Sequence, residues 1–254
     1  MKQIPNFVTL LNLFAGCLAI VFALQTEAVT IYVNDNFESS FNVPEKLTWA
    51  SICIFAAAII DFLDGFVARL FNASSEMGKQ LDSLSDVVSF GVAPGVILYQ
   101  LLRFSYAREE DGLSTSMMLL LPAFIVSCAA AWRLAKFNID TQQTYHFRGV
   151  PSPAVGILIA SFPMLLHYPS FAAVSDYLVN KWVLYIIIIM LSYLMVCNIP
   201  MMALKIRDKS LRSNLPKLIL AVIVLLSAIL LQWLAVPIAF IVYIILSLVY
   251  KKQF

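Results

Sequence analysis

Charged residues are scarce in this sequence. Only 13% of the 254 residues are Asp, Glu, Lys or Arg, whereas 61% are hydrophobic and the mean hydropathy is +0.86. This balance lies far outside what a soluble globular domain needs. The chain also lacks a polar stretch long enough for a separate soluble domain. The composition therefore predicts a single domain embedded in a bilayer.

Cysteine and histidine are scarce as well. Four cysteines lie singly in apolar stretches: Cys17, Cys53, Cys128 and Cys197. Because no two of them are close in sequence, they indicate neither a disulfide framework nor a zinc site. We expect His146 to be a loop residue and His167 an interfacial residue, not catalysts. The net charge of +2 gives no sign of a nucleic-acid partner, and we expect none.

Long apolar stretches recur along the whole chain. A membrane-spanning helix needs roughly 20 apolar residues, and we predict eight of them, which makes the protein an all-α, polytopic transmembrane bundle. The predicted spans are 7–25, 47–70, 77–103, 114–136, 152–168, 181–204, 216–233 and 235–250. A hairpin or re-entrant element is the alternative to two full crossings for the last pair. We expect the first span to be a permanent helix and not a cleaved signal, because its basic flank is thin.

The basic residues are distributed unevenly between the two ends of these helices. One end has only four: Lys46, Arg103, Arg108 and Lys181. The opposite end carries Lys2, Arg69, Lys79, Arg133, Lys136, Arg148, Lys205, Arg207, Lys209, Arg212, Lys217, Lys251 and Lys252. Because cytoplasmic loops are enriched in Lys and Arg, we expect this second end and both termini to face the cytoplasm.

Four aspartates interrupt the second and third predicted helices: Asp61, Asp64, Asp82 and Asp86. An unpaired carboxylate inside a membrane is energetically costly, so these residues need a compensating partner. A lone intramembrane aspartate can serve in helix pairing or proton relay. Four of them on two adjacent helices favour a metal site.

Small residues share the helix faces that carry the aspartates. At about 100° per residue, Gly65 and Ala68 fall on the Asp61 face of the second helix. The third helix repeats the pattern with Gly78, Ser85 and Ser89. Because small side chains let backbones approach, we expect the two faces to pack together and to converge all four carboxylates near the cytoplasmic surface.

Four carboxylates cannot all stay ionised in a low-dielectric site unless cations hold them. Oxygen ligands without His or Cys select hard ions, so we predict a Mg²⁺ or Mn²⁺ cofactor, with two ions bridged by carboxylates. Ca²⁺ would fit the same ligands without activating. Such a pair suits the clamping of a diphosphate, and Arg69, one turn beyond the aspartates, is placed to hold a phosphate.

The spacing of these residues resembles a known signature. Asp61-Phe-Leu-Asp64-Gly65-Phe-Val-Ala68-Arg69 is followed by eight residues, Gly78, three residues, Asp82, three residues and Asp86. All fixed positions of the CDP-alcohol phosphotransferase signature are present. The resemblance implies a six-helix core, which we place at 1–204, with a basic loop and a C-terminal helix pair at 205–254. It also implies a homodimer.

The resemblance further implies roles for the signature residues. Asp61, Asp64 and Asp82 would bind the metals, and Asp86 would be both a ligand and the general base toward the acceptor hydroxyl. The residues expected against the CDP moiety are Asp61, Gly65, Ala68, Arg69 and Gly78.

The segment 5–12 resembles the first helix of the same family. Asn6 and Thr9 are spaced to share a helix face, where they would touch the nucleotide. Capping of the helix is the alternative role for both.

A second region narrows the acceptor alcohol. The segments 85–94, 133–138 and 147–154 resemble those of phosphatidylserine synthases of the bacterial and archaeal membrane type. Free serine offers a carboxylate, an ammonium and a hydroxyl, so its pocket needs a cation and polar oxygens, which Arg133, Asn138 and Ser152 would supply. Alternatively, Arg133 only anchors a helix end, and Pro151-Ser152-Pro153 only starts a helix.

We therefore expect a membrane transferase that moves the phosphatidyl group of CDP-diacylglycerol, a membrane lipid, to L-serine and releases CMP. Glycerol 3-phosphate is the alternative acceptor, although its phosphate would need more convergent basic residues. A cation-coupled transporter is a distant alternative, which would need polar residues at several membrane depths. The expected location is the cytoplasmic membrane of a bacterium or archaeon, with the active site on the cytoplasmic side.

Overall fold

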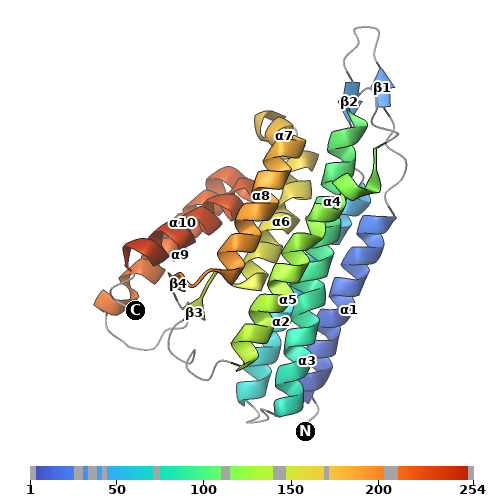
Figure 1. Cartoon of the computed structure of the whole chain (residues 1–254). Helices are drawn as coiled ribbons and strands as arrows, with labels where there is room; N and C mark the ends of the chain where they lie inside the picture. The colour runs from blue at the N-terminus through green and yellow to red at the C-terminus, as the bar shows by residue number, and fades with distance from the viewer. Residues whose placement is uncertain are drawn as a thin grey trace.

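A computed structural model of the chain describes residues 4–25, 31–33, 39–41, 45–70, 75–109, 115–139, 147–168, 172–202 and 211–250. Long helices run side by side in a bundle, and the last two lie tilted against it (Figure 1). The helices are α1 Ile4–Leu24, α2 Glu45–Leu70, α3 Glu76–Val87, α4 Ala93–Ala107, α5 Ile125–Ile139, α6 Ser152–His167, α7 Ala172–Leu178, α8 Lys181–Val196, α9 Leu211–Leu231 and α10 Ala235–Val249. This architecture confirms the predicted all-α polytopic bundle.

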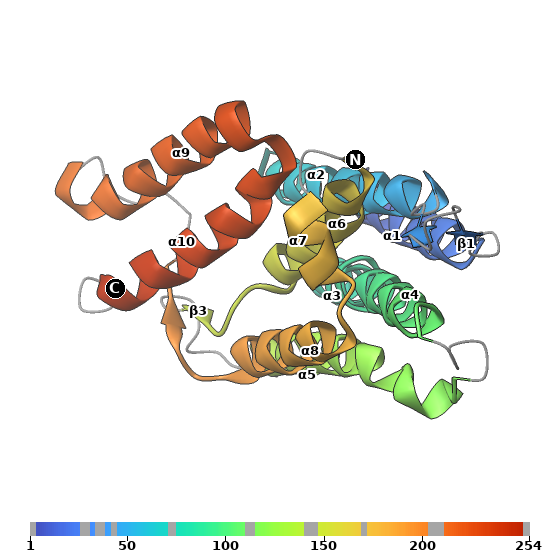
Figure 2. The same cartoon turned by 90° about the horizontal axis from the view of Figure 1, so that it is seen from above.

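Length and composition make five helical runs suitable for crossing a membrane. These runs are Pro5–Leu24, Glu45–Val67, Glu76–Ala107, Met117–Ile139 and Asn214–Val249, and two shorter apolar helices, α6 and α8, accompany them. A tight turn at Gln232–Leu234, where Gln232 has φ 47°, divides the last run into α9 and α10. Figure 2 shows these two helices folding back on each other as a hairpin. Each of the eight predicted spans therefore contains a helix.

The third predicted span is one continuous helix with a π-helical segment in its middle. Val88–Val92, labelled η1, connects α3 to α4, and Pro94 follows it at the start of α4. Because Pro94 has no N–H to donate, the regular hydrogen-bond ladder is interrupted there. The run Glu76–Ala107 is the most enclosed of the five, because 72% of its most apolar 18-residue stretch is buried inside the protein. It therefore forms the centre of the bundle.

Helix α1 packs closely on α2 and on the α3–α4 helix. Ser89 Oγ donates a hydrogen bond to Asn12 O at 3.0 Å, and Gln100 Nε2 donates to Ala23 O at 2.8 Å. A methyl group at Gly16 would stand 2.4 Å from Ser89 Oγ, so only glycine allows this close crossing. Small and polar residues thus bring α1 against the continuous α3–α4 helix, as is common in membrane bundles.

The sixth predicted span is shorter than expected. We predicted 181–204, but α8 ends at Val196 and the chain continues into strand β4, Pro200–Met201. β4 pairs antiparallel with β3, Phe147–Arg148, and Leu194 O accepts a hydrogen bond from Val150 N at 2.9 Å. Pro200 disfavours helix at the preceding residue, and the strand pairing satisfies the backbone groups instead.

A second short hairpin lies at the opposite end of the bundle, where β1 Ile31–Val33 pairs with β2 Ser39–Phe41. Two of the four basic residues predicted for the less basic end form ion pairs there. Lys181 forms an ion pair with Glu109, and Arg108 Nη2 lies 3.9 Å from Asp176 Oδ1. The start of α3 and the end of α2, the half of that helix that carries its aspartates, lie at the other end, where α1 begins (Figure 1).

Candidate active site

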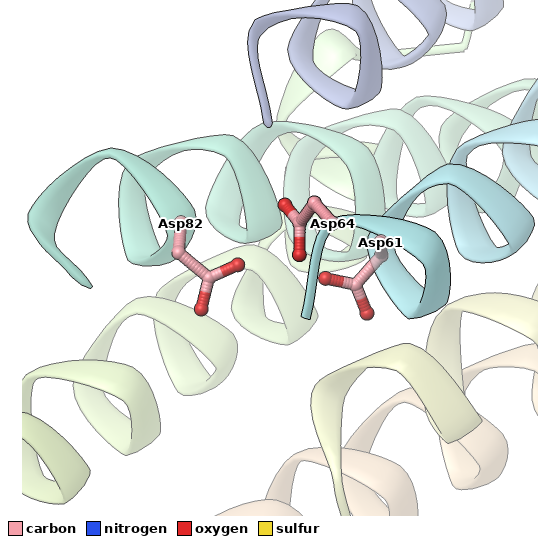
Figure 3. Close-up of side chains that lie close together, drawn as sticks. All are labelled: Asp61, Asp64 and Asp82. Atoms are coloured by element: carbon pink, nitrogen blue, oxygen red, sulfur yellow. The ribbon is translucent and has the colours of Figure 1, made fainter. Parts of the chain in front are cut away.

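Three of the predicted aspartates meet in the structure. Asp61 and Asp64 come from α2, and Asp82 comes from α3. One carboxylate oxygen from each lies within 4.8 Å of the others. Figure 3 shows their carboxyl groups turned toward a shared space between the two helices.

The route by which these carboxylates converge differs from our prediction. We expected the small-residue faces of α2 and α3 to pack on each other, but these helices barely touch, and α1 lies against both. Ser85 Oγ of α3 donates to Thr9 O of α1 at 3.0 Å, so this face of α3 is used for contact with α1. Because α2 and α3 do not pack together, room is left between their aspartates.

Asp86 lies one turn beyond Asp82 on α3 and is buried. Asn12 Nδ2 of α1 donates to Asp86 Oδ1 at 3.5 Å. Asp86 does not belong to the group of three within 4.8 Å among the described residues. Its carboxylate still lies within electrostatic range of all three. The structure therefore places Asp86 at the edge of the cluster.

The three converging carboxylates fit a hard divalent cation. All the atoms that could bind a metal here are carboxylate oxygens. Asp64 Oδ2 is buried without a hydrogen-bond partner among the described residues. A buried acceptor without a partner is costly unless an ion or donor occupies the space in front of it. Mg²⁺ and Mn²⁺ prefer such ligands, so Asp61, Asp64 and Asp82 would hold either ion.

The residues predicted on α1 lie beside this cluster. Asn6 faces the third helix, because a methyl group at Gly78 would stand 3.1 Å from Asn6 Oδ1. The Thr9 side chain neighbours the Asp64 carboxylate, and its hydroxyl donates to Pro5 O at 3.1 Å. Since α1 begins at Ile4, both residues lie inside the helix and not at its N-cap.

Open space surrounds Gly65, the predicted contact for the nucleotide. A methyl group there would meet nothing within 4 Å, so protein packing does not require glycine at this position. A ligand lying against α2 would require it. The side chains of Ala68 and Arg69 lie outside the described residues, and their contacts with CDP stay predictions.

Two of the three residues predicted for the acceptor pocket are together. Arg133 of α5 is only 8% exposed, and its Nη1 donates to Ser152 Oγ, at the start of α6, over 3.4 Å. The Arg133 guanidinium lies within electrostatic range of Asp86, and its Nε has no hydrogen-bond partner among the described residues. A buried cation with a free donor beside a carboxylate cluster is a suitable site for a small anionic group.

Asn138, the third predicted acceptor residue, lies elsewhere. Its Nδ2 donates to Ser83 Oγ of α3 at 2.8 Å, and its backbone oxygen accepts from Lys79 Nζ at 3.4 Å. Five residues along a helix turn a side chain by roughly 140°, which explains why Asn138 and Arg133 point apart. The structure thus does not bring Asn138 to the Arg133–Ser152 pair.

An apolar cavity of about 870 Å³ lies next to this region, between α2, α6, α9 and α10. Its lining includes Phe62, which follows Asp61 in the chain, with Pro153, Ile157, Val224, Trp233 and Tyr243. The C-terminal helix pair, which we had treated as an addition to the core, therefore forms a wall beside the candidate site.

Two residues beside the candidate site, one near Asp86 and one near Arg133, were absent from our predicted site. Asn12 could have been found, because it is a polar residue in an apolar helix and continues the three-residue spacing of Asn6 and Thr9. Tyr243 lies within electrostatic range of Arg133, but it comes from α10. No local sequence pattern connects it to residues more than 100 positions earlier.

Comparison with known proteins gives a consistent result. The chain is similar to proteins named CDP-diacylglycerol–serine O-phosphatidyltransferase from Helicobacter pylori (34% identity over 61% of this chain and 54% of that protein), Methanocaldococcus jannaschii (33% over 77% and 72%) and Bacillus subtilis (33% over 65% and 81%). The chain thus spans about half the length of the Helicobacter pylori relative.

A family model described as CDP-alcohol phosphatidyltransferase matches residues 2–194, which include all four aspartates, Arg133 and Ser152. With a match over most of its length, the chain belongs to the CDP-alcohol phosphatidyltransferase family.

Proposed function

We propose that this protein transfers a phosphatidyl group from CDP-diacylglycerol to L-serine and so forms phosphatidylserine and CMP. The observation that carries the proposal is the group of three carboxylates from α2 and α3, with Asp86 within electrostatic range of all three and the buried Arg133 within electrostatic range of Asp86. The names of the relatives support serine as the acceptor. A metal-held diphosphate and an amino-acid carboxylate would each find a matching partner in this arrangement.

Each residue of the site has a part in the proposed reaction. Divalent ions held by Asp61, Asp64 and Asp82 would neutralise the diphosphate and the charge on the leaving CMP. Arg133 binds the serine carboxylate and directs the hydroxyl toward Asp86. The serine oxygen forms the new P–O bond, the P–O bond to CMP breaks, and Asp86 takes the hydroxyl proton.

The apolar cavity supports a lipid donor. At about 870 Å³ it has the size and the lining for an acyl chain, and it reaches Phe62 beside the aspartates. An acyl chain there would place the diphosphate of the same lipid toward α2.

We expect this end of the bundle to face the cytoplasm. We also expect the protein to form a homodimer, with a six-helix core that ends near residue 204.

The alternative acceptor, glycerol 3-phosphate, receives less support. Its phosphate carries two negative charges and calls for several basic groups. Arg133 is the one buried Lys or Arg among the residues whose side chains the structure describes. A transporter is disfavoured by membership of a transferase family and by the gathering of three carboxylates in one group.

Purified protein tests the proposal directly. CMP release is measured in three separate reactions, each of which contains CDP-diacylglycerol and one acceptor: L-serine, glycerol 3-phosphate or inositol. We expect release only in the reaction that contains L-serine, and no release from an Asp61→Ala, Asp82→Ala double variant. Release with glycerol 3-phosphate but not with serine would overturn the assigned acceptor.

A further inference from the structure

Two side chains of α10 hold both backbone groups of Met202. Tyr243 Oη donates to Met202 O at 3.1 Å, and Ser247 Oγ accepts from Met202 N at 3.2 Å. Ser247 is fully buried, and Tyr243 and Met202 are nearly so. The two polar residues stand one turn apart on an otherwise apolar helix, where polar groups need a structural or functional reason. We call this pair of hydrogen bonds the Met202 clamp.

The clamped residue is connected to the start of α6 through backbone hydrogen bonds. Met202 follows β4 directly, and β4 pairs with β3. Beyond β3, Gly149 N donates to Ile199 O at 2.9 Å. Gly149 has φ 76°, and a methyl group there would stand 2.4 Å from Met195 O, so the two segments approach as closely as the backbone allows. Ser152, the hydrogen-bond acceptor for Arg133, comes three residues later.

Tyr243 also lies close enough to Arg133 to interact with it directly. Its phenol oxygen lies within electrostatic range of the Arg133 guanidinium. Arg133 has one hydrogen bond to Ser152, while its Nε has no partner among the described residues. A long buried side chain with so few hydrogen bonds among the described residues depends on its neighbours for its orientation.

We propose that Tyr243 and Ser247 are positioning residues for the acceptor site: the Met202 clamp fixes the segment that carries Ser152 and thereby orients Arg133. The inference rests on the proposed function, because it assigns the Arg133–Ser152 pair to the acceptor alcohol. Both positioning residues lie outside residues 2–194, the part of the chain that the family model matches. The C-terminal hairpin would thus contribute to acceptor binding in addition to lining the apolar cavity.

Two single substitutions test the clamp. Tyr243→Phe removes the hydroxyl but keeps the ring that lines the apolar cavity, and Ser247→Ala removes the other half of the clamp. We expect each to raise the KM for serine roughly three- to tenfold, the range that one net hydrogen bond supports, with the KM for CDP-diacylglycerol and kcat within about twofold of wild type. A general loss of stability would instead affect both substrates and lower the melting temperature.

Matched controls come from hydrogen bonds away from the site. Tyr106→Phe removes a tyrosine hydroxyl that bonds Tyr185 Oη at 2.9 Å near the far end of the bundle. Ser227→Ala removes a buried α9 hydroxyl whose hydrogen bond, among the described residues, goes to Val224 O of its own helix. Both controls should keep the wild-type KM for serine.

The outcomes separate this inference from the proposed function. A wild-type protein that releases CMP with another acceptor but not with serine refutes the serine assignment, and the clamp is then tested with that acceptor by the same KM comparison. An unchanged acceptor KM in both folded variants, or an equal rise in the control variants, overturns the positioning role. If Tyr243→Phe is not recovered folded, Ser247→Ala decides alone.

Discussion

Replacement of Arg133 separates acceptor binding from helix anchoring. Arg133 is 8% exposed, and its guanidinium donates to Ser152 Oγ at 3.4 Å and lies in electrostatic range of Asp86. A hydrogen bond to a charged group contributes about 1.5–3 kcal/mol, so loss of the serine carboxylate's partner in Arg133→Ala should lower kcat/KM for serine roughly 10- to 150-fold. The KM for CDP-diacylglycerol should change less than about threefold, because we propose that Arg133 binds serine and not the lipid substrate.

Two further variants make this test specific. Arg133→Lys keeps the positive charge that would anchor a helix end but loses the planar guanidinium, so we expect at least about a fivefold loss for serine. Arg103→Ala removes an exposed arginine of α4 and should leave both substrates within about twofold of wild type. Initial rates with each substrate varied in turn give the constants. Equal losses for both substrates in Arg133→Ala, or wild-type behaviour of Arg133→Lys, would refute acceptor binding.

The other predictions concern the aspartates and Gly65. Removal of divalent ions with a chelator should abolish CMP release, and Mg²⁺ or Mn²⁺ should restore it; full turnover in metal-free buffer would contradict the metal site. Asp61→Ala or Asp82→Ala should raise the KM for CDP-diacylglycerol and lower kcat together, so an unchanged donor KM would count against metal binding. Asp86→Asn should keep donor binding while kcat falls by about 10²–10⁴-fold, and a near wild-type rate would exclude a general base there. Gly65→Ala should raise the donor KM and leave the melting temperature equal or higher, because alanine stabilises a helix by up to about 1 kcal/mol and meets no atom within 4 Å; a lower melting temperature would show that packing requires the glycine.

Hydropathy predicted the positions of the helices well, because lipid requires each crossing segment to satisfy its own backbone hydrogen bonds. Helix ends were less predictable where the chain leaves the membrane. The end of α8 at Val196 depends on pairing with residues 147–150, and this partner lies about 50 positions away in the sequence. The π-helical segment before Pro94 also escaped hydropathy, which does not distinguish one helical ladder from another.

The aspartate cluster was predictable because a carboxylate in an apolar helix is conspicuous and because spacing fixes which residues share a face. Periodicity does not say which helix that face will meet. We paired the Ser85 face with α2, whereas it contacts α1 through Thr9. The same limit applies to Asn138. We grouped it with Arg133 because their segment resembles that of phosphatidylserine synthases and because serine needs polar oxygens, but it contacts Ser83. Tyr243 depends entirely on how the C-terminal hairpin folds back.

One measurement tests the proposed transfer most directly. Purified protein is incubated with CDP-diacylglycerol and isotopically labelled L-serine, with and without Mg²⁺, and both CMP and the labelled lipid are quantified. We predict that phosphatidylserine and CMP form in equal amounts and only when a divalent ion is present. CMP release without a serine-containing lipid, or equal product in the presence of a chelator, would contradict a metal-dependent phosphatidyl transfer to serine.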